Sequence, residues 1–252
     1  MKKVIALILA LTMTLVAVGA MADTLTMATN ASFPPYEYVD DAENAPVVVD
    51  GVGYYGIDVE IAAAIAEKLG YDFSIADIAF GAIISGVQTG KYSFGMAGMT
   101  VTEERMESVN FSTSYATATQ VIIVKEGSPI TSIDDVLSGN YVVGVQQDTT
   151  GSIYMKDDIG EDKVVEYPTG NDATMALVTG KVDCVCIDNQ PAQNYVAANE
   201  GLQILPTEYV TENYAACFAK ENTELLDAFN AALAELTADG TIDAIVAKYI
   251  HD

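Results

Sequence analysis

Hydrophobic positions in the first half of the chain switch between the two-residue period of strands and the period of about 3.6 residues of helices. Short strands are predicted at residues 25–27, 73–75 and 92–97, and helices at 57–69 and 83–87. Gly70 and Gly90 follow the helical stretches, as glycines commonly do at helix ends. This β-α-β-α-β order predicts a mostly parallel sheet with helices on both faces.

The same order recurs in the second half of the chain. Strands are predicted at 141–145, 164–167 and 182–187, and helices at 152–156 and 173–178. The triplet Thr89-Gly90-Lys91 precedes the strand that reaches Gly98, and Thr179-Gly180-Lys181 precedes the strand that reaches Asp188, at the same offset. The matching order and offset indicate two related α/β units.

Ligands of such sheets bind beyond the carboxyl ends of the strands, so Gly98 and Asp188 are predicted to face one cleft between the two units. Apolar segments at 120–125 and 214–220 are suited to be the two crossings of a hinge. Helices at 224–237 and 242–250 then return the chain to the first unit. We therefore expect a discontinuous first lobe, residues 23–117 and 213–252, and a second lobe, residues 118–212.

The first 22 residues have the pattern of a cleavable signal peptide. Lys2 and Lys3 precede an uncharged apolar stretch at 4–18, and Ala20-Met21-Ala22 forms a small-x-small cleavage site. No cysteine lies near the cut, so no acyl anchor is predicted. We expect cleavage after Ala22 and a periplasmic protein.

The chain carries 36 acidic and 11 basic residues, a formal net charge of −25. This balance argues against nucleic acid and anionic membranes as partners, because both bind surfaces rich in lysine and arginine. Half of the residues are hydrophobic, enough to bury a core in one or two domains.

Cys184, Cys186 and Cys217 leave two alternatives open, one disulfide with a spare thiol or three free thiols. His251 is the only histidine and lies next to the C-terminus, so the usual partners of a zinc site are missing. No metal and no cofactor is predicted.

Arg105 is the only arginine of the chain. If Thr102 caps a helix, Arg105 lies in its first turn, where the helix dipole disfavours a cation. A planar guanidinium suits bidentate binding of a carboxylate. The alternative is a solvated ion pair with the neighbouring glutamates.

Several motifs, in this order and spacing, resemble the polar amino-acid-binding family of extracytoplasmic solute-binding proteins, which serve ABC importers. They are Asn30–Tyr38, Gly56–Ile61, Ala97–Arg105, Asn110-Phe-Ser, Gly144–Thr150, Val182–Asp188, Asp239-Gly-Thr and Lys248-Tyr. The resemblance implies a two-lobed α/β fold of the type II periplasmic-binding-protein kind, with a two-strand hinge between the lobes.

The resemblance also implies roles for single residues. Arg105 would bind the α-carboxylate of an amino acid, and Asp188 its ammonium group; from its position alone, Asp188 is also a candidate helix N-cap. Gly98 and Thr100 match positions that meet the ammonium group, and Thr100 also reaches the carboxylate. Thr150, at a helix start, would donate to the carboxylate, with Thr149 as a weaker neighbour.

Side-chain selectivity depends on the remaining positions. Phe33 and Phe80 match the aromatic pair that sandwiches the ligand side chain, and Tyr36 would border the same pocket. Asn30, Gln146 and Ile187 are uncharged, which favours an uncharged polar ligand such as glutamine, asparagine or cystine. Asp148 stands where relatives commonly have glycine, and an inward Asp148 would favour a basic amino acid.

The resemblance thus implies a non-catalytic, monomeric binding protein that closes around an amino acid and delivers it to a membrane permease. One rival is a dehydratase on the same scaffold, which would need a positioned acid or base. A second rival is a sensory module, which is normally fused to a membrane or signalling segment.

Overall fold

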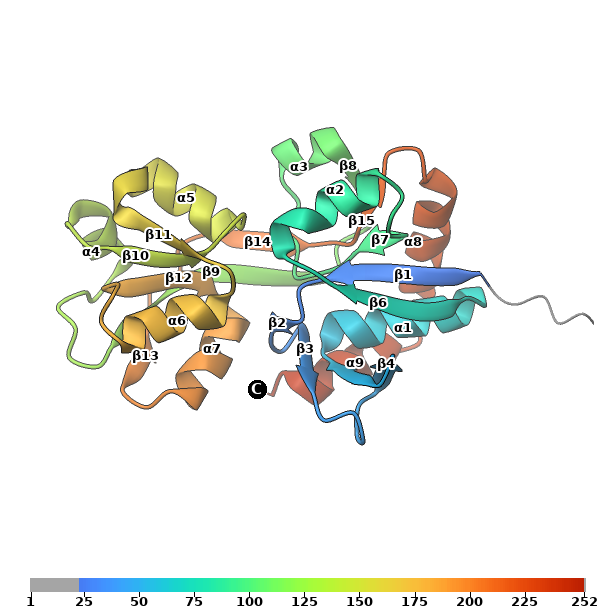
Figure 1. Ribbon diagram of the computed structural model, residues 1–252, viewed down its shortest axis with the longest axis horizontal. Helices are drawn as coiled ribbons and strands as arrows, with labels where there is room; N and C mark the ends of the chain where they lie inside the picture. The colour runs from blue at the N-terminus through green and yellow to red at the C-terminus, as the bar shows by residue number, and fades with distance from the viewer. Residues whose placement is uncertain (1–22, 252) are drawn as a thin grey trace, which may run out of the picture.

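Three sheets organise residues 23–251, the part of the chain that the computed structural model describes (Figure 1). The predicted signal peptide, residues 1–22, lies outside this range. None of the helices within it is long and apolar enough to cross a membrane.

The sheet of the first lobe has the order β6-β1-β7-β15-β8. Its strands are β1 (Thr24–Thr29), β6 (Asp72–Asp77), β7 (Phe94–Gly95), β8 (Val109–Phe111) and β15 (Cys217–Ala219). The first three are parallel, as predicted, whereas β15 joins β7 and β8 in antiparallel orientation. Phe94, Phe218 and Phe229 pack against one another in the core beside this sheet.

Helices cover both faces of this sheet (Figure 1). They are α1 (Ile57–Leu69), α8 (Thr223–Ala238) and α9 (Thr241–Tyr249) on one side, and η1 (Phe80–Ala82), α2 (Ile83–Gln88) and α3 (Glu103–Ser108) on the other. Ile57, Ile61 and Ile65 recur every four residues along α1 and are all buried.

The sheet of the second lobe has the order β11-β10-β12-β9-β13. Its strands are β9 (Ala116–Lys125), β10 (Val143–Gln146), β11 (Val164–Tyr167), β12 (Cys184–Asp188) and β13 (Leu202–Ile204). Here too there is a parallel core, β11-β10-β12. It is extended by β9, antiparallel to β12, and then by β13, antiparallel to β9. The helices around it are α4 (Ile133–Ser138), α5 (Thr150–Ile159), η2 (Glu161–Lys163), α6 (Gly170–Val178) and α7 (Asn189–Ala198).

A third, antiparallel sheet in the first lobe is absent from the predicted elements. It contains β2 (Ser32–Phe33), β3 (Glu37–Asp40), β4 (Val47–Val49) and β5 (Val52–Tyr55), in the order β2-β3-β5-β4. Its strands are only two to four residues long, too short to show a clear alternation in the sequence.

Two paired strands cross between the lobes, β9 and β14 (Thr211–Tyr214). Figure 1 shows them side by side in the middle of the molecule. The predicted second crossing at 214–220 was wrong in position, because most of that apolar segment forms β15 within the first lobe. The predicted lobe boundaries fall inside β9 and β14 and stay a prediction.

The repeated triplets occupy equivalent places in the two lobes. Gly90 after α2 and Gly180 after α6 both adopt positive φ, 69° and 75°. The hydroxyls of Thr89 and Thr179 both donate to carbonyls three and four residues back in their helices. The same helix ending therefore leads into a strand of each sheet, which supports a common origin of the two units.

The three cysteines are buried free thiols. The alternative of a disulfide with a spare thiol is therefore excluded. Within residues 23–251, no group of three or more histidine, cysteine, aspartate or glutamate side chains could hold a metal ion.

Asp58, in the first turn of α1, is a buried acid that positions a turn of the first lobe. One of its oxygens, Oδ2, accepts hydrogen bonds from the Gly98 backbone N–H at 2.8 Å and from the Tyr115 hydroxyl at 2.6 Å. Burial raises the pKa of Asp58 to about 7, although these two donors oppose the shift. Burial and the neighbouring Asp58 also raise the pKa of Glu37, well above its usual range.

The Asp58 carboxyl should make folding depend on pH. The pKa of Asp58 is higher in the folded protein, about 7, than the ordinary value of 3.8. The resulting contribution to the unfolding free energy is fully present below pH 3.8 and is lost as the pH rises to about 7. We therefore expect Asp58→Asn to flatten the decline in unfolding free energy over this window, by up to about 1.4 kcal/mol per pH unit. Urea unfolding of the ligand-free protein across this range measures the slope.

Tyr115→Phe is the matched variant for this prediction. It removes a donor that lowers the Asp58 pKa, so the upper end of the pH window should move above about pH 7. Superimposable pH profiles for the wild type and Asp58→Asn would contradict the assignment.

Gly56 should be the glycine that is hardest to replace near α1. It has φ of 119°, and a Cβ atom there would lie 2.2 Å from the Tyr36 carbonyl oxygen. We expect Gly56→Ala to cost about 3 kcal/mol or more in unfolding free energy. Gly70→Ala is the control, since Gly70 also has positive φ but its Cβ would meet nothing within 4 Å; it should cost only about 1–2 kcal/mol.

Candidate functional site

A cavity opens between the two large sheets, near the carboxyl ends of β7, β10 and β12. The protein atoms around it leave about 330 Å³ of empty space, part of it open to solvent. Its lining residues are Asn30, Phe33, Glu37, Phe80, Ala97, Gly98, Thr100, Arg105, Gln146, Thr149, Thr150 and Asp188. The set includes ten of the eleven residues predicted from the sequence to contact a ligand, and the exception is Tyr36.

Arg105 lies in the first turn of α3, where the Thr102 hydroxyl caps the helix by accepting the Arg105 N–H at 3.1 Å. Its side chain is only 9% exposed, and none of the ion pairs among residues 23–251 includes it. The solvated ion pair considered above is therefore wrong. Burial lowers the pKa of Arg105, although a guanidinium stays charged in any protein.

Two carbonyl oxygens hold the guanidinium of Arg105. Nη1 donates to Thr100 in the first lobe at 2.8 Å, and Nη2 donates to Asp148 in the second lobe at 3.2 Å. The guanidinium carbon also lies 5.3 Å from the centre of the Phe80 ring. A guanidinium has five N–H donors, so these two bonds leave donors for a further acceptor in the cavity.

Asp188 ends β12 and occupies the N-cap position of α7, but its side chain makes no capping hydrogen bond. Instead, its Oδ1 accepts the hydroxyl of Tyr214, a residue of the hinge strand β14. Burial raises the pKa of Asp188, and the negative charge of Glu212 adds to the shift. A cation beside Asp188 would offset both effects.

Glu212 is a buried hinge residue that the sequence reasoning missed. Its two oxygens accept the Gln120 amide at 2.8 Å and the Tyr154 hydroxyl at 3.0 Å. These bonds connect both hinge strands to α5, since Gln120 lies in β9 and Tyr154 in α5. The hinge therefore contributes negative charge behind the cavity.

Gly98 and Thr100 form the first-lobe rim of the cavity. Gly98 has φ of 53°, and a Cβ atom there would lie 2.8 Å from the Phe33 ring. Only glycine therefore allows Phe33 to pack over this turn. The Thr100 hydroxyl lies 3.5 Å from the hydroxyl of Thr150 across the cleft.

Thr149 and Thr150 come from the start of α5. Thr149 is the N-cap and accepts the Ser152 N–H at 3.4 Å, while its own hydroxyl donates to the Gln146 carbonyl at 2.7 Å. The Thr149 hydroxyl is therefore engaged within its own turn. Thr150 follows as the first helical residue, and its hydroxyl is buried in the cavity wall.

Asn30 and Gln146 join across the cleft at the end of the cavity. The Gln146 amide donates to Asn30 Oδ1 at 3.0 Å, and the Asn30 amide donates to the Ile78 carbonyl at 3.0 Å. Ile187, the third variable position, is buried but does not line the cavity.

Tyr36 lies behind the cavity wall. It is 1% exposed, with its ring centre 6.0 Å from that of Phe33 and 5.1 Å from that of Tyr214. The family resemblance had implied a position at the border of the pocket. In the structure Tyr36 supports the Phe33 and Tyr214 side chains instead of facing the cavity.

Asp148 contributes its backbone and not its side chain to the neighbourhood of the cavity. Its carboxylate lies against Gly81 of the first lobe, where an added Cβ would be 2.1 Å from Oδ2. Asp148 lines an adjoining surface groove instead of the cavity itself. The inward orientation considered from the sequence therefore does not occur.

Glu37 and Ala97 line the cavity without having been predicted from the sequence. Glu37 is 1% exposed, and its Oε2 atom has no hydrogen-bond partner among residues 23–251. In the small third sheet it pairs directly with Phe33. An acid between two tyrosines, just after Phe33-Pro-Pro, was the available signal in the sequence.

The cavity is thus lined by a buried cation without a carboxylate partner and two buried acids without a cationic partner, among the residues described.

The family model of the bacterial extracellular solute-binding proteins, family 3, matches residues 25–252. The arginine-binding extracellular protein ArtP of Bacillus subtilis is 31% identical over 234 residues, which cover 89% of this chain and 85% of that protein.

Solved structures agree with this match. An ancestral arginine-binding protein bound to glutamine has a TM-score of 0.82 and 36% identity, covering 92% of this chain and 100% of that one. An ancestral amino acid-binding protein, a precursor of cyclohexadienyl dehydratase, has a TM-score of 0.81 and 29% identity, covering 90% and 96%. The chain belongs to family 3 of the bacterial extracellular solute-binding proteins.

Proposed function

We propose that the protein captures an amino acid between its lobes and delivers it to the permease of an ABC importer. One observation carries this proposal: Arg105 and Asp188, of opposite charge, reach one cavity from different lobes, and neither has an ionic partner among residues 23–251. The carboxylate and ammonium groups of an α-amino acid supply both missing partners. Thr150, at the start of α5, adds a hydroxyl donor for the carboxylate.

Closure of the lobes around the ligand follows from the same arrangement. Only the closed conformation brings Arg105 and Asp188 to one ligand, so the ligand binds this conformation better and shifts the population towards it. The paired strands β9 and β14 supply the hinge. Together with the predicted signal peptide, the family supports capture outside the cytoplasmic membrane.

A basic amino acid, arginine first, is the ligand we propose. Taken alone, the uncharged side chains of Asn30 and Gln146 favour an uncharged polar ligand. Glu37, however, also lines the cavity. A buried carboxyl with an unpartnered oxygen suits a guanidinium, which would allow Glu37 to ionise and pair with it. The arginine-binding relative from B. subtilis supports the same choice.

Glutamine is the second candidate. With an amide ligand Glu37 would stay protonated, and its unpartnered oxygen could accept an amide N–H. The ancestral arginine-binding protein bound to glutamine supports this candidate. The protonation state of Glu37 would therefore differ between the two complexes, ionised with arginine and protonated with glutamine.

We infer a binding protein and not an enzyme. The acids at the cavity have structural partners, since Asp188 accepts the Tyr214 hydroxyl and Glu37 lies beside Asp58. The dehydratase alternative has support from one neighbour that is a precursor of such an enzyme. Turnover of a prephenate-like acid by the purified protein would overturn the inference.

The proposal is tested by calorimetric titration of the ligand-stripped protein with the common amino acids. We expect arginine to bind and to release a proton, because its cation lowers the raised pKa of Glu37. The apparent enthalpy should then vary with the ionisation enthalpy of the buffer, and the affinity for arginine should rise with pH. Glutamine should bind without proton release. A protein that binds no amino acid would refute the proposed function.

Glu37→Gln should separate the two ligands. We expect arginine affinity to fall by about 10- to 100-fold, since a charged hydrogen bond is lost, and glutamine affinity to stay within about threefold. The exposed acid Glu43 of the same lobe provides the control, Glu43→Gln, which should change neither affinity. Equal effects of Glu37→Gln on both ligands would exclude the proposed role of Glu37.

A further inference from the structure

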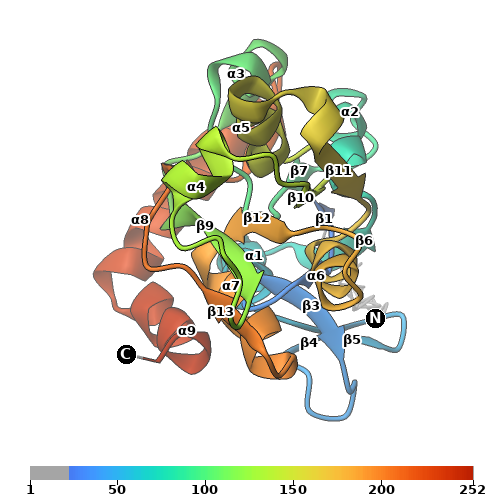
Figure 2. The same ribbon diagram turned by 90° about the vertical axis from the view of Figure 1, so that its left-hand side faces the viewer.

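Residues 30–33 of the first lobe accept hydrogen bonds from two elements of the second lobe. The Gln146 amide donates to Asn30 Oδ1, and the Tyr195 hydroxyl of α7 donates to the Ser32 carbonyl at 2.9 Å. In Figure 1 and Figure 2 alike, α7 lies beside β3, the strand that pairs with Ser32. Both bonds join the two lobes, so both must break when the lobes separate.

The accepting segment is fixed by hydrogen bonds within the first lobe. The Ala31 N–H donates to Asp77 Oδ1 at 2.9 Å, and the Asn30 amide donates to the Ile78 carbonyl at 3.0 Å. These bonds attach the segment to the end of β6. The Ser32 carbonyl therefore keeps its position in the first lobe whether or not the second lobe has closed onto it.

The donor, Tyr195, is fixed in the second lobe. Its side chain is 5% exposed and packs against Gly170 at the start of α6, where an added Cβ would lie 3.1 Å from the hydroxyl oxygen. Burial raises the pKa of Tyr195, and the charges of Glu37 and Asp188 add to the shift, so the hydroxyl keeps the proton that it donates. Because α7 starts directly after Asp188, one helix connects the proposed ammonium site with this bond.

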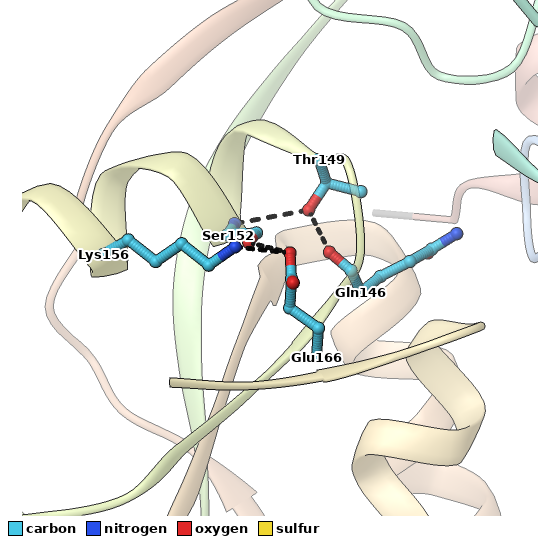
Figure 3. Close-up of polar contacts among 5 residues, drawn as sticks. All are labelled: Gln146, Thr149, Ser152, Lys156 and Glu166. Atoms are coloured by element: carbon cyan, nitrogen blue, oxygen red, sulfur yellow. Dashed lines mark hydrogen bonds and ion pairs between the residues drawn. The ribbon is translucent and has the colours of Figure 1, made fainter. Parts of the chain in front are cut away.

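The bond from Gln146 differs from that of Tyr195, because a ligand can replace it. Gln146 lines the cavity, and Figure 3 shows its carbonyl bonded to the Thr149 hydroxyl while its side chain extends away from this bond. A ligand in the cavity can therefore compete with Asn30 for the Gln146 amide. Arg105 and Thr150, which also contact the opposite lobe, line the cavity as well.

The hydrogen bond between Tyr195 and Ser32 lies outside the cavity, since neither residue lines it. It is therefore compatible with any ligand that the closed lobes hold. We propose that Tyr195 is a positioning residue for cleft closure, whose bond to Ser32 stabilises the closed conformation without contact with the ligand. The inference rests on the proposed capture of an amino acid in this cavity.

A bond of this kind has a distinct effect on binding. It forms on closure whatever the ligand, so its loss makes closure less favourable by the same factor for every ligand. The apparent affinity falls in proportion to the population of the binding-competent state. Since the ligand leaves from the opened form, the dissociation rate should rise while the association rate changes little.

The test measures arginine and glutamine binding to Tyr195→Phe by calorimetric titration and stopped-flow kinetics. The substitution removes only the hydroxyl, so we expect both affinities to fall by the same factor, about three- to tenfold, mainly through faster dissociation. The control is Tyr55→Phe, because the Tyr55 hydroxyl also donates to a backbone carbonyl, that of Asp41 at 2.6 Å, but within the first lobe. Tyr55→Phe should change neither affinity.

The comparison of two ligands distinguishes closure from ligand selectivity. Unequal losses in Tyr195→Phe would mean that Tyr195 acts on the ligand side chain, through Phe33 or Glu37 next to Ser32, and would overturn the inference. Wild-type affinity for both ligands would overturn it as well, whether or not the variant has lower thermal stability. Failure of the wild type to bind any amino acid would instead refute the proposed function.

Discussion

A buried guanidinium that has no carboxylate partner in the described part of the chain is the constraint on which the site depends. Arg105 is held by two carbonyl oxygens, one from each lobe, and stacks near Phe80. Carbonyl groups orient a guanidinium but do not neutralise its charge, so the desolvation of Arg105 is offset only in part. An anion that enters the cavity therefore gains a preorganised partner, and it gains most when the lobes are closed.

The acids around the cavity require a cationic group on the ligand, just as Arg105 requires an anionic one. Asp188 and Glu37 line it, while Asp58 and Glu212 lie behind them in α1 and the hinge. Burial raises the pKa of Asp188, Glu37 and Asp58, so this region favours bound protons or cations. A zwitterion satisfies Arg105 and Asp188 together, and a basic side chain would also satisfy Glu37. Because Asp188 contacts Tyr214 of the hinge strand, ligand charge and hinge geometry are directly connected.

Most regular elements could be predicted from the sequence because their signals are local, whereas most cavity residues were predicted from the resemblance to a known family. The periodicity of α1, the glycine after each repeated triplet and the Thr102 cap before Arg105 each depend on a few neighbouring residues. The third sheet could not be predicted, because its short strands are defined by pairing. For the same reason Glu37 was missed and Tyr36 was expected at the cavity. The register between β2 and β3 pairs Phe33 with Glu37, and this pairing determines that Glu37 and not Tyr36 faces the cavity. The Asp148 orientation depends on the other lobe and has no local signal.

The central claim is that Arg105 binds the α-carboxylate of the captured amino acid, and Arg105→Lys tests it most directly. A lysine keeps the charge but cannot hold both carbonyl oxygens and a bidentate carboxylate at once. Calorimetric titration with arginine should show at least about a 100-fold loss of affinity, while circular dichroism shows an intact fold. An Arg105→Lys protein that binds arginine as tightly as the wild type would contradict the account.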